Sequence, residues 1–189
     1  FDYLKKLGFT TLVDYQVGAD GSVYSDIGLP LALGGLTYGV SNIEMTAAFA
    51  SIANSGIYNE PYYYTKVLDH SGNVLLQHET NSRQVMKTST AYLLTSAMQD
   101  TIRPGVGSST QPAFLDYEMP IAGKTGTTTN SNDRWFCAYT PYYTCSIWMG
   151  FDNNFFHVYN EVYNGDIINA KTHGLHSATD TVYNTAYNE

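Results

Sequence analysis

The sequence has 189 residues, of which 43% are hydrophobic and 14% aromatic, so it can bury the core of one domain. Nine basic and seventeen acidic side chains give a net charge of −8, which opposes binding to nucleic acid and to anionic membrane surfaces. No apolar run approaches the roughly 20 residues that span a bilayer, so we expect no transmembrane segment in this chain and any membrane anchor outside it.

The chain opens with a short helical signal that is followed by a long stretch rich in turn formers. Residues 1–7 read as the last turns of a helix, with Lys5 and Lys6 near its C-terminus and Gly8 as the left-handed residue that ends it. We therefore expect the start of this chain to cut that helix. Residues 10–39 show no sustained period, which predicts an irregular connection packed on the rest of the domain.

A capping box marks the next helix. In Ser41-Asn42-Ile43-Glu44 the serine hydroxyl can accept from the Glu44 amide, while the Glu44 side chain accepts from the Ser41 amide. The helix should run to about residue 53 and stop at residues 54–56, which read Asn-Ser-Gly. The apolar spacing predicts that one face is buried, formed by Ile43, Ala47, Ala48 and Ile52.

A hairpin and a second helix are predicted for the middle of the chain. Residues 63–68 and 74–78 bracket a loop that contains glycine, as in a β-hairpin. The helix should begin at residue 88 or 89, run to about residue 102 and end at residues 103–105, which read Arg-Pro-Gly. The side chains expected to face inward are Leu93, Leu94, Ala97, Met98 and Ile102.

Three strands should follow one another from residue 120 onward. The candidates are residues 121–127, 135–139 and 145–151, each rich in strand-forming side chains or bounded by turn formers. They predict an antiparallel sheet with helices on its flanks. The fold class that we expect is α/β of the α+β type.

Two cysteines flank the predicted turn at residues 140–143. If the loop has three residues, Cys137 and Cys145 fall opposite each other across the hairpin, often with poor orientation for a disulfide. We expect two buried thiols. The chain has no Cys-x-x-Cys pattern, which leaves a zinc or thioredoxin-like site with little support.

The most informative motif lies in the first of the three strands. Residues 122–128 read Ala-Gly-Lys-Thr-Gly-Thr-Thr, so the strand carries a cation beside two hydroxyl groups that could hold an anion. A phosphate-binding loop is the competing interpretation of Gly123-Lys124-Thr125. That motif needs a glycine five places before Gly123, where Glu118 stands, and is therefore rejected.

Five segments in order resemble the transpeptidase domain of bifunctional (class A) penicillin-binding proteins. The longest is residues 32–45, and residues 122–128 contain the Lys-Thr-Gly signature. The other three are Asp133-Arg134-Trp135-Phe136, Tyr139-Thr140-Pro141 and Trp148-Met149-Gly150-Phe151-Asp152. The resemblance covers residues 1 to about 153 and is weaker over 154–189, where Ser177 could cap a further helix. It implies an incomplete sheet-and-helix fold of the penicillin-binding protein and serine β-lactamase type, with residues 1–189 as the C-terminal part of a single domain.

The resemblance also implies roles for the strand residues. Lys124 would supply positive charge and assist proton transfer, and Thr125 and Thr127 would hold the substrate carboxylate through their hydroxyls. The Thr127 amide would be an oxyanion donor. Gly126 would let the substrate backbone approach the strand edge, so that Gly126→Val should block binding. The family's Ser-x-x-Lys and Ser-x-Asn motifs are expected outside this chain.

The function implied is part of a peptidoglycan D,D-transpeptidase on the extracytoplasmic face of the bacterial cell membrane. Its partners would be the peptidoglycan stem peptide, β-lactam antibiotics and the upstream remainder of the same polypeptide, and no cofactor or metal is expected. The alternative is a non-catalytic module that binds peptidoglycan or scaffolds a cell-wall complex. A β-lactamase or D,D-carboxypeptidase ranks lower, because such enzymes lack the long match at residues 32–45.

Other candidate residues have simpler interpretations. Asp133 and Trp135 are expected to cap a turn and fill the core rather than to react. His173 and His176 have a spacing that could hold a metal, but no cluster of ligands joins them, so exposed histidines are favoured. The run Tyr62-Tyr63-Tyr64 could line a glycan or peptide groove, although half-buried strand residues are the preferred interpretation.

Overall fold

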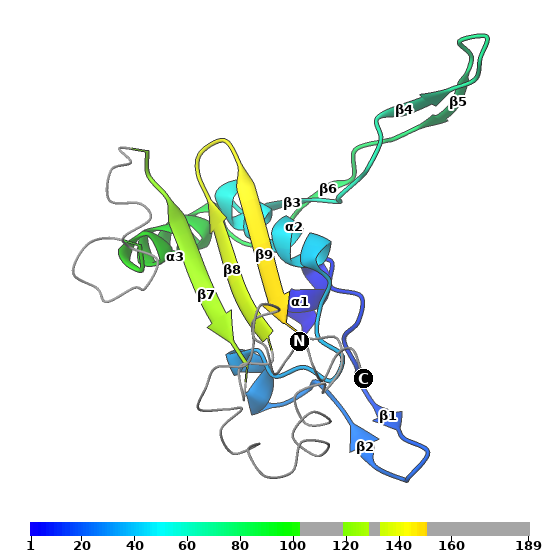
Figure 1. Ribbon diagram of the computed structural model, residues 1–189. Coiled ribbons are helices and arrows are strands. Elements are labelled where there is room, and N and C mark those ends of the chain that lie inside the picture. Colours follow the sequence, from blue (N-terminus) through cyan, green and yellow to red (C-terminus); the bar gives the residue numbers. More distant parts are fainter. Residues whose placement is uncertain (103–118, 129–132, 151–189) are drawn as a thin grey trace, which may run out of the picture. The chain divides into compact units, whose positions relative to one another are not determined.

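The computed structural model describes residues 1–102, 119–128 and 133–150, which are coloured along the sequence in Figure 1. The chain divides into two compact units. The first comprises residues 1–126 and 135–148, and the second comprises residues 127–134 and 149–189. The predicted helix end at 103–105 and the weakly matched tail at 154–189, with its histidines, lie outside the described residues.

The first helix ends as predicted. Helix α1 covers Asp2–Lys6, and Gly8 follows it with φ +85°, a conformation that favours glycine. A Cβ atom on Gly8 would also collide with the Tyr58 hydroxyl. Arg83 Nε donates to the Lys6 carbonyl at 3.1 Å, which ties the end of α1 to the unit.

The segment at residues 10–39 is more ordered than predicted. Strands β1 (Gln16–Val17) and β2 (Val23–Tyr24) form an antiparallel pair, and a 3-10 helix covers Leu29–Leu33. The expectation of an irregular connection is wrong at these places. Two-residue strands are too short to produce an alternating pattern in the sequence.

The capping box and the helix after it are confirmed. Helix α2 covers Asn42–Ala53, and the Ser41 hydroxyl accepts from the Glu44 amide at 3.3 Å. Glu44 Oε2 in turn accepts from the Ser41 amide at 2.9 Å. Ala47 and Ala48 are buried as predicted, Ile43 and Ile52 are half-buried, and the polar Glu44 and Ser51 are buried with them.

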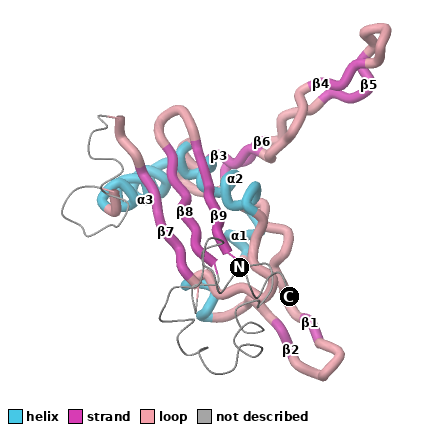
Figure 2. Tube along the Cα trace, viewed as in Figure 1, coloured by secondary structure: helices cyan, strands magenta, loops and turns pink. Residues whose placement is uncertain are grey.

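Four short strands link the two long helices. Strands β4 (Lys66–Leu68) and β5 (Val74–Gln77) confirm the predicted hairpin and form the ribbon that extends from the unit in Figure 2. Strands β3 (Ile57–Asn59) and β6 (Ser82–Gln84) pair at its base and were not predicted. A small core underlies them, made of Ala47, Tyr58, Val85, Met86 and Ala91.

The second long helix is confirmed, but its buried face is not the predicted one. Helix α3 covers Thr88–Asp100, and the side chains of Leu93 and Leu94 are 66% and 40% exposed. Ala97 is also exposed, whereas Ala91 and Ile102 are buried and Met98 is half-buried. The prediction holds for Ile102 and in part for Met98, and it is wrong for Leu93, Leu94 and Ala97.

Three strands form the sheet that carries the motif. They are β7 (Ala122–Thr127), β8 (Asp133–Tyr139) and β9 (Thr144–Gly150), in the order β7-β8-β9. Neighbouring strands run in opposite directions (Figure 1), so the sheet is antiparallel, as predicted. Helix α3 lies against one face of it (Figure 1), where Thr95 Oγ1 and Tyr139 Oη are 2.7 Å apart. The mixed helix and antiparallel sheet architecture confirms the predicted fold class.

The two cysteines differ in exposure. The Thr140 amide donates to the Tyr143 carbonyl at 2.9 Å, so the turn has two residues at its tip rather than three residues in the loop. This change in register places the two thiols on different faces of the hairpin. Cys137 is buried, as predicted, and Cys145 is exposed, against the prediction; both are free thiols. Burial raises the pKa of the Cys137 thiol.

Candidate functional site

Strand β7 lies at an edge of the described sheet, and exposure changes along its length. Ala122 and Gly123 are buried, Gly126 is half-buried, and the side chains of Lys124, Thr125 and Thr127 are exposed. The polar groups of the motif are therefore accessible to a ligand rather than packed inside a core.

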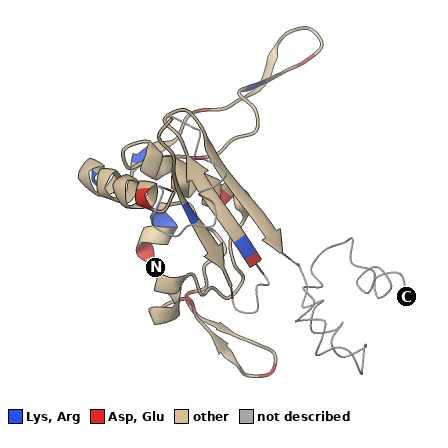
Figure 3. Ribbon diagram, turned by 60° about the vertical axis from the view of Figure 1, so that its left-hand side comes forward, with Lys and Arg blue, Asp and Glu red and all other residues tan. Residues whose placement is uncertain are grey.

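Lys124 is the charged residue of β7. Its Nζ atom donates to the Thr125 carbonyl at 2.6 Å, and no carboxylate of the described residues forms an ion pair with it. In the three strands the other charged residues are Asp133 and Arg134, at the start of β8. Figure 3, in which charged residues are coloured on the ribbon, shows how few of them the strands contain. An anion at this edge would meet a cation that is not already neutralised.

Gly123 anchors β7 to helix α3. Thr101 Oγ1, directly after the helix, donates to the Gly123 carbonyl at 2.5 Å and to the Met98 carbonyl at 2.9 Å. A Cβ atom on Gly123 would lie 3.0 Å from the Ala138 Cβ. Neither Gly123 nor Thr101 could be recognised from the sequence as an anchor, because neither residue type signals a helix-to-strand contact. Together they fix the strand that presents Lys124.

Gly126 differs from Gly123 in the space around it. A Cβ atom there would lie 3.4 Å from the Trp135 Cβ, an ordinary van der Waals contact. The fold of this unit therefore does not require glycine at position 126. The predicted role of Gly126, room for a substrate backbone, can be tested without disrupting the sheet.

We predict opposite stability effects for alanine at the two glycines. Gly123→Ala should lower the free energy of unfolding by about 2 kcal/mol, because the added methyl group overpacks the contact with Ala138 and the Cys137 carbonyl. Gly126→Ala should change it by less than about 0.5 kcal/mol. Urea unfolding of both variants measures the difference. Equal losses would contradict the assignment of Gly123 as the packing glycine.

Asp133, the first residue of β8, bonds to Thr128, which directly follows β7. The Thr128 amide donates to the Asp133 carbonyl at 3.1 Å, and the Thr128 hydroxyl donates to Asp133 Oδ2 at 2.9 Å. The Asp133 amide donates to the Thr128 hydroxyl at 2.9 Å. These bonds agree with the predicted structural role of Asp133. Trp135 is half-buried, as expected of a residue that fills space beside the strand.

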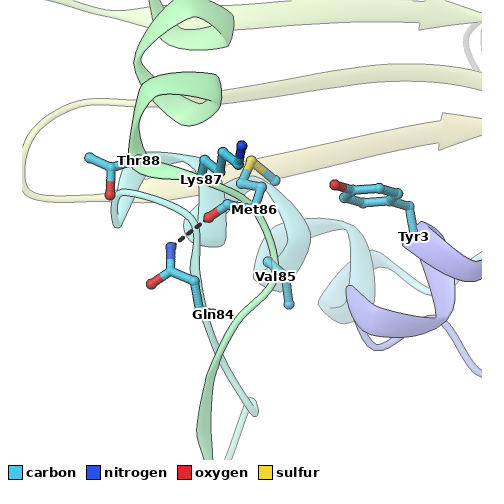
Figure 4. Close-up of a pocket in the computed structure, with 6 residues that line it drawn as sticks. All are labelled: Tyr3, Gln84, Val85, Met86, Lys87 and Thr88. Atoms are coloured by element: carbon cyan, nitrogen blue, oxygen red, sulfur yellow. Dashed lines mark hydrogen bonds between the residues drawn. The ribbon is translucent and has the colours of Figure 1, made fainter.

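A pocket of about 460 Å³ lies in another part of the first unit. Figure 4 shows its lining, which consists of Tyr3 and residues 84–88. The Gln84 amide is directed at the Met86 carbonyl, with Nε2 and the oxygen 2.5 Å apart. No residue of the Lys-Thr-Gly-Thr motif lines this pocket, so it adds nothing to the candidate site.

The family's Ser-x-x-Lys and Ser-x-Asn motifs were both expected outside this chain, and this expectation is correct for Ser-x-x-Lys alone. No serine of the sequence has a lysine three places on, but Ser71-Gly72-Asn73 has the Ser-x-Asn spacing, against the expectation. It lies in the turn between β4 and β5, where the Asn73 amide donates to Asp69 Oδ1 at 2.9 Å and Asn73 Nδ2 donates to Oδ2 at 2.9 Å. This asparagine stabilises a hairpin turn.

Comparison with known proteins identifies the family. The penicillin-binding protein transpeptidase domain matches residues 1–163. The chain belongs to this family. Penicillin-binding protein 1F of Bacillus subtilis is 34% identical over 155 residues, which cover 79% of this chain and 21% of that protein. Penicillin-binding protein 1A of Clostridium novyi is 38% identical over 119 residues, 63% of this chain and 14% of that protein.

Solved structures of penicillin-binding proteins share the fold. PonA1 of Mycobacterium tuberculosis has a TM-score of 0.57 and 24% identity, with 79% of this chain and 40% of that chain covered. Penicillin-binding protein 1A of Haemophilus influenzae has a TM-score of 0.58 and 18% identity, with 81% and 26% covered. The predicted resemblance to class A penicillin-binding proteins and the predicted fold are confirmed. The chain spans between 14% and 21% of the length of the two relatives named above.

The described residues contain neither a membrane span nor a metal cluster. Among them, no helix has the length and apolar character needed to cross a bilayer. Groups of three or more histidine, cysteine, aspartate or glutamate side chains with metal-binding geometry are also absent from this part of the penicillin-binding protein domain. His173 and His176 lie outside it.

Proposed function

We propose that this chain is the C-terminal part of a transpeptidase domain that transfers acyl groups from D-Ala-D-Ala stem peptides of peptidoglycan. The single observation that carries the proposal is the exposed Lys-Thr-Gly-Thr sequence on an edge strand, in a chain of the transpeptidase family. A serine on an upstream segment of the parent polypeptide would be the nucleophile.

The reaction divides one difficult amide exchange into two easier steps. The serine oxygen attacks the carbonyl of the penultimate D-alanine, its proton passes through a nearby base to the leaving amine, and the terminal D-alanine departs. An amine of a neighbouring strand then attacks the acyl-enzyme ester and restores the serine. Each step forms a tetrahedral intermediate with a negatively charged oxygen.

The residues of β7 would act on the charges in these steps. The Lys124 ammonium group attracts the terminal carboxylate of the substrate, and the exposed Thr125 and Thr127 hydroxyls donate hydrogen bonds to it. The Thr127 amide donates to the oxyanion, a contact whose removal typically costs about 3 kcal/mol. Gly126 leaves room for the substrate backbone to add to the sheet edge as an extra strand.

The same groups would bind β-lactam antibiotics, since these also combine a reactive carbonyl with a carboxylate. The reaction would take place on the extracytoplasmic face of the cell membrane, where peptidoglycan is assembled. The anchor that holds the enzyme there would lie in another part of the parent polypeptide.

Fluorescent penicillin labelling tests the proposal. The isolated 189-residue chain should not become covalently labelled, because none of its serines has the lysine of a Ser-x-x-Lys motif. The parent polypeptide should be labelled, and replacement of its upstream motif serine by alanine should abolish the label. A folded parent polypeptide that stays unlabelled would contradict the catalytic proposal and favour the non-catalytic peptidoglycan-binding module.

A further inference from the structure

Three consecutive tyrosines lie exposed in the loop between β3 and β4. The side chains of Tyr62, Tyr63 and Tyr64 are 50%, 87% and 45% exposed. The preferred sequence interpretation, half-buried strand residues, is wrong, because β4 begins only at Lys66 and the tyrosines precede it. Figure 2 shows this loop at the base of the β4–β5 ribbon. Contiguous exposed aromatic side chains are a common feature of binding surfaces.

One of the three rings is held in a fixed orientation. The Tyr62 ring stacks on the His78 ring, with centroids 4.0 Å apart and an interplanar angle of 21°. The His78 amide donates to the Thr65 carbonyl at 3.0 Å, so the histidine is tied to the same loop from the far side of the ribbon. A ligand that stacks on Tyr62 therefore meets a ring whose rotational freedom is already reduced.

Polar groups that can bond to hydroxyls and amides lie beside the tyrosines. The Glu60 amide donates to the Asn81 carbonyl at 3.1 Å, and Asn81 Nδ2 donates to Glu60 Oε2 at 3.0 Å. Ser82 Oγ donates to Asn59 Oδ1 at 2.7 Å. These side chains are exposed and each retains further donors or lone pairs. The loop thus combines aromatic faces with a polar border.

We propose that the loop carrying Tyr62, Tyr63 and Tyr64 binds an uncharged glycan strand. A pyranose ring presents C–H groups on one face, which fit the negative face of an aromatic ring, and hydroxyls at its edge, which fit the polar border. The net charge of −8 on the chain disfavours an anionic polysaccharide. The identity of the natural ligand rests on the proposed function: the glycan strand bound here would be the one that carries the stem peptide.

Titration of the 189-residue chain with an N-acetylglucosamine hexamer, followed by nuclear magnetic resonance, tests the inference. Saturable binding is expected, and Tyr63→Ala should weaken it about tenfold because it removes the most exposed ring. Tyr62→Ala should have a similar effect. A galacturonate oligomer of the same length should bind more weakly than the uncharged hexamer.

The matched control is the double variant Tyr142→Ala/Tyr143→Ala, in which two tyrosines that are 73% and 81% exposed are removed from the β8–β9 turn. Its affinity should equal that of the unmodified chain. No binding, equal losses in both sets of variants, or equal affinity for the anionic oligomer would overturn the inference. Because the hexamer carries no peptide, these outcomes are independent of penicillin labelling.

Discussion

Replacement of Lys124 by alanine in the parent polypeptide should slow covalent acylation by penicillin about a hundredfold or more. The change removes the ammonium group that attracts the substrate carboxylate, and an electrostatic contact of this kind is worth about 3 kcal/mol in the transition state. The fold should be unaffected, because the Lys124 side chain is exposed and its Nζ atom donates to the carbonyl of the neighbouring Thr125. A time course of covalent labelling with fluorescent penicillin gives the acylation rate.

The control for this experiment is Lys66→Ala, which removes another exposed lysine, from strand β4. It should be acylated at the unmodified rate, so that a general effect of lost charge is excluded. Lys124→Arg should recover part of the rate, because the charge remains while its shape changes. If Lys124→Ala were acylated as fast as the unmodified protein, with an unchanged melting temperature, the proposed role of this lysine would be wrong.

Local sequence signals predicted the three α-helices and the ends of α1 and α2. The capping box at Ser41 and Glu44 needs only contacts within one turn, and Gly8 stops a helix through its own backbone conformation. The edge strand with the motif was predicted for a similar reason, since the strand and the turn formers that bound it lie within one short stretch of the sequence. Such elements depend on neighbours in the sequence, which a pattern can show.

Contacts between distant segments were not predicted. The orientation of α3 is set by what its face meets: Thr95 reaches Tyr139, and the leucines are left exposed. The opposite exposure of Cys137 and Cys145 follows from a turn that is one residue different from the one expected. In both cases a small change of rotation or register inverts which side chains are buried.

The candidate site shows the same division. Its residue types, order and position on a strand could be read from the motif, and the exposure of Lys124, Thr125 and Thr127 agrees with an accessible edge. The anchoring of that edge could not be predicted from the motif, because Thr101 bonds to the Gly123 carbonyl across a separation of 22 residues. Every residue type has a backbone carbonyl, so the identity of a residue does not show whether its carbonyl accepts such a bond.

A buried carboxylate holds together the segment that the sequence had suggested was irregular. Asp26 Oδ2 accepts from the Val13 amide at 2.7 Å, and Oδ1 accepts from the Thr37 amide and hydroxyl, each at 2.7 Å. Burial alone would raise the pKa of Asp26, but these three bonds outweigh burial and hold the pKa below its ordinary value. Residues on both sides of the β1–β2 hairpin are thereby tied to one side chain.

Glu44 forms a second junction of this kind. Its Oε1 accepts from the Thr10 amide at 2.9 Å and from the Thr10 hydroxyl at 2.6 Å, while Oε2 serves the capping box at Ser41. Burial opposes ionisation here too, and the bonds from Thr10 and Ser41 lower the pKa of Glu44 below its ordinary value. The ionised form of each carboxylate is therefore favoured by folding.

We expect Asp26→Ala to lower the free energy of unfolding by about 3 kcal/mol at neutral pH, because it leaves three hydrogen-bond donors without their acceptor. Asp20→Ala is the matched control. Asp20 accepts from the Ser22 amide at 3.0 Å and from its hydroxyl at 2.7 Å, but in an exposed turn, so its loss should have little effect on the free energy of unfolding. Urea unfolding compares the two variants.

The pH dependence follows from the direction of the two pKa shifts. Since the folded pKa values of Asp26 and Glu44 lie below the unfolded ones, their stabilisation is complete above the unfolded values and is lost as pH falls through the folded values. Unfolding free energy should thus decline below about pH 5, and the decline should be shallower in Asp26→Ala than in the unmodified chain. Parallel declines in these two proteins would contradict the assignment of Asp26 as an acid-sensitive junction.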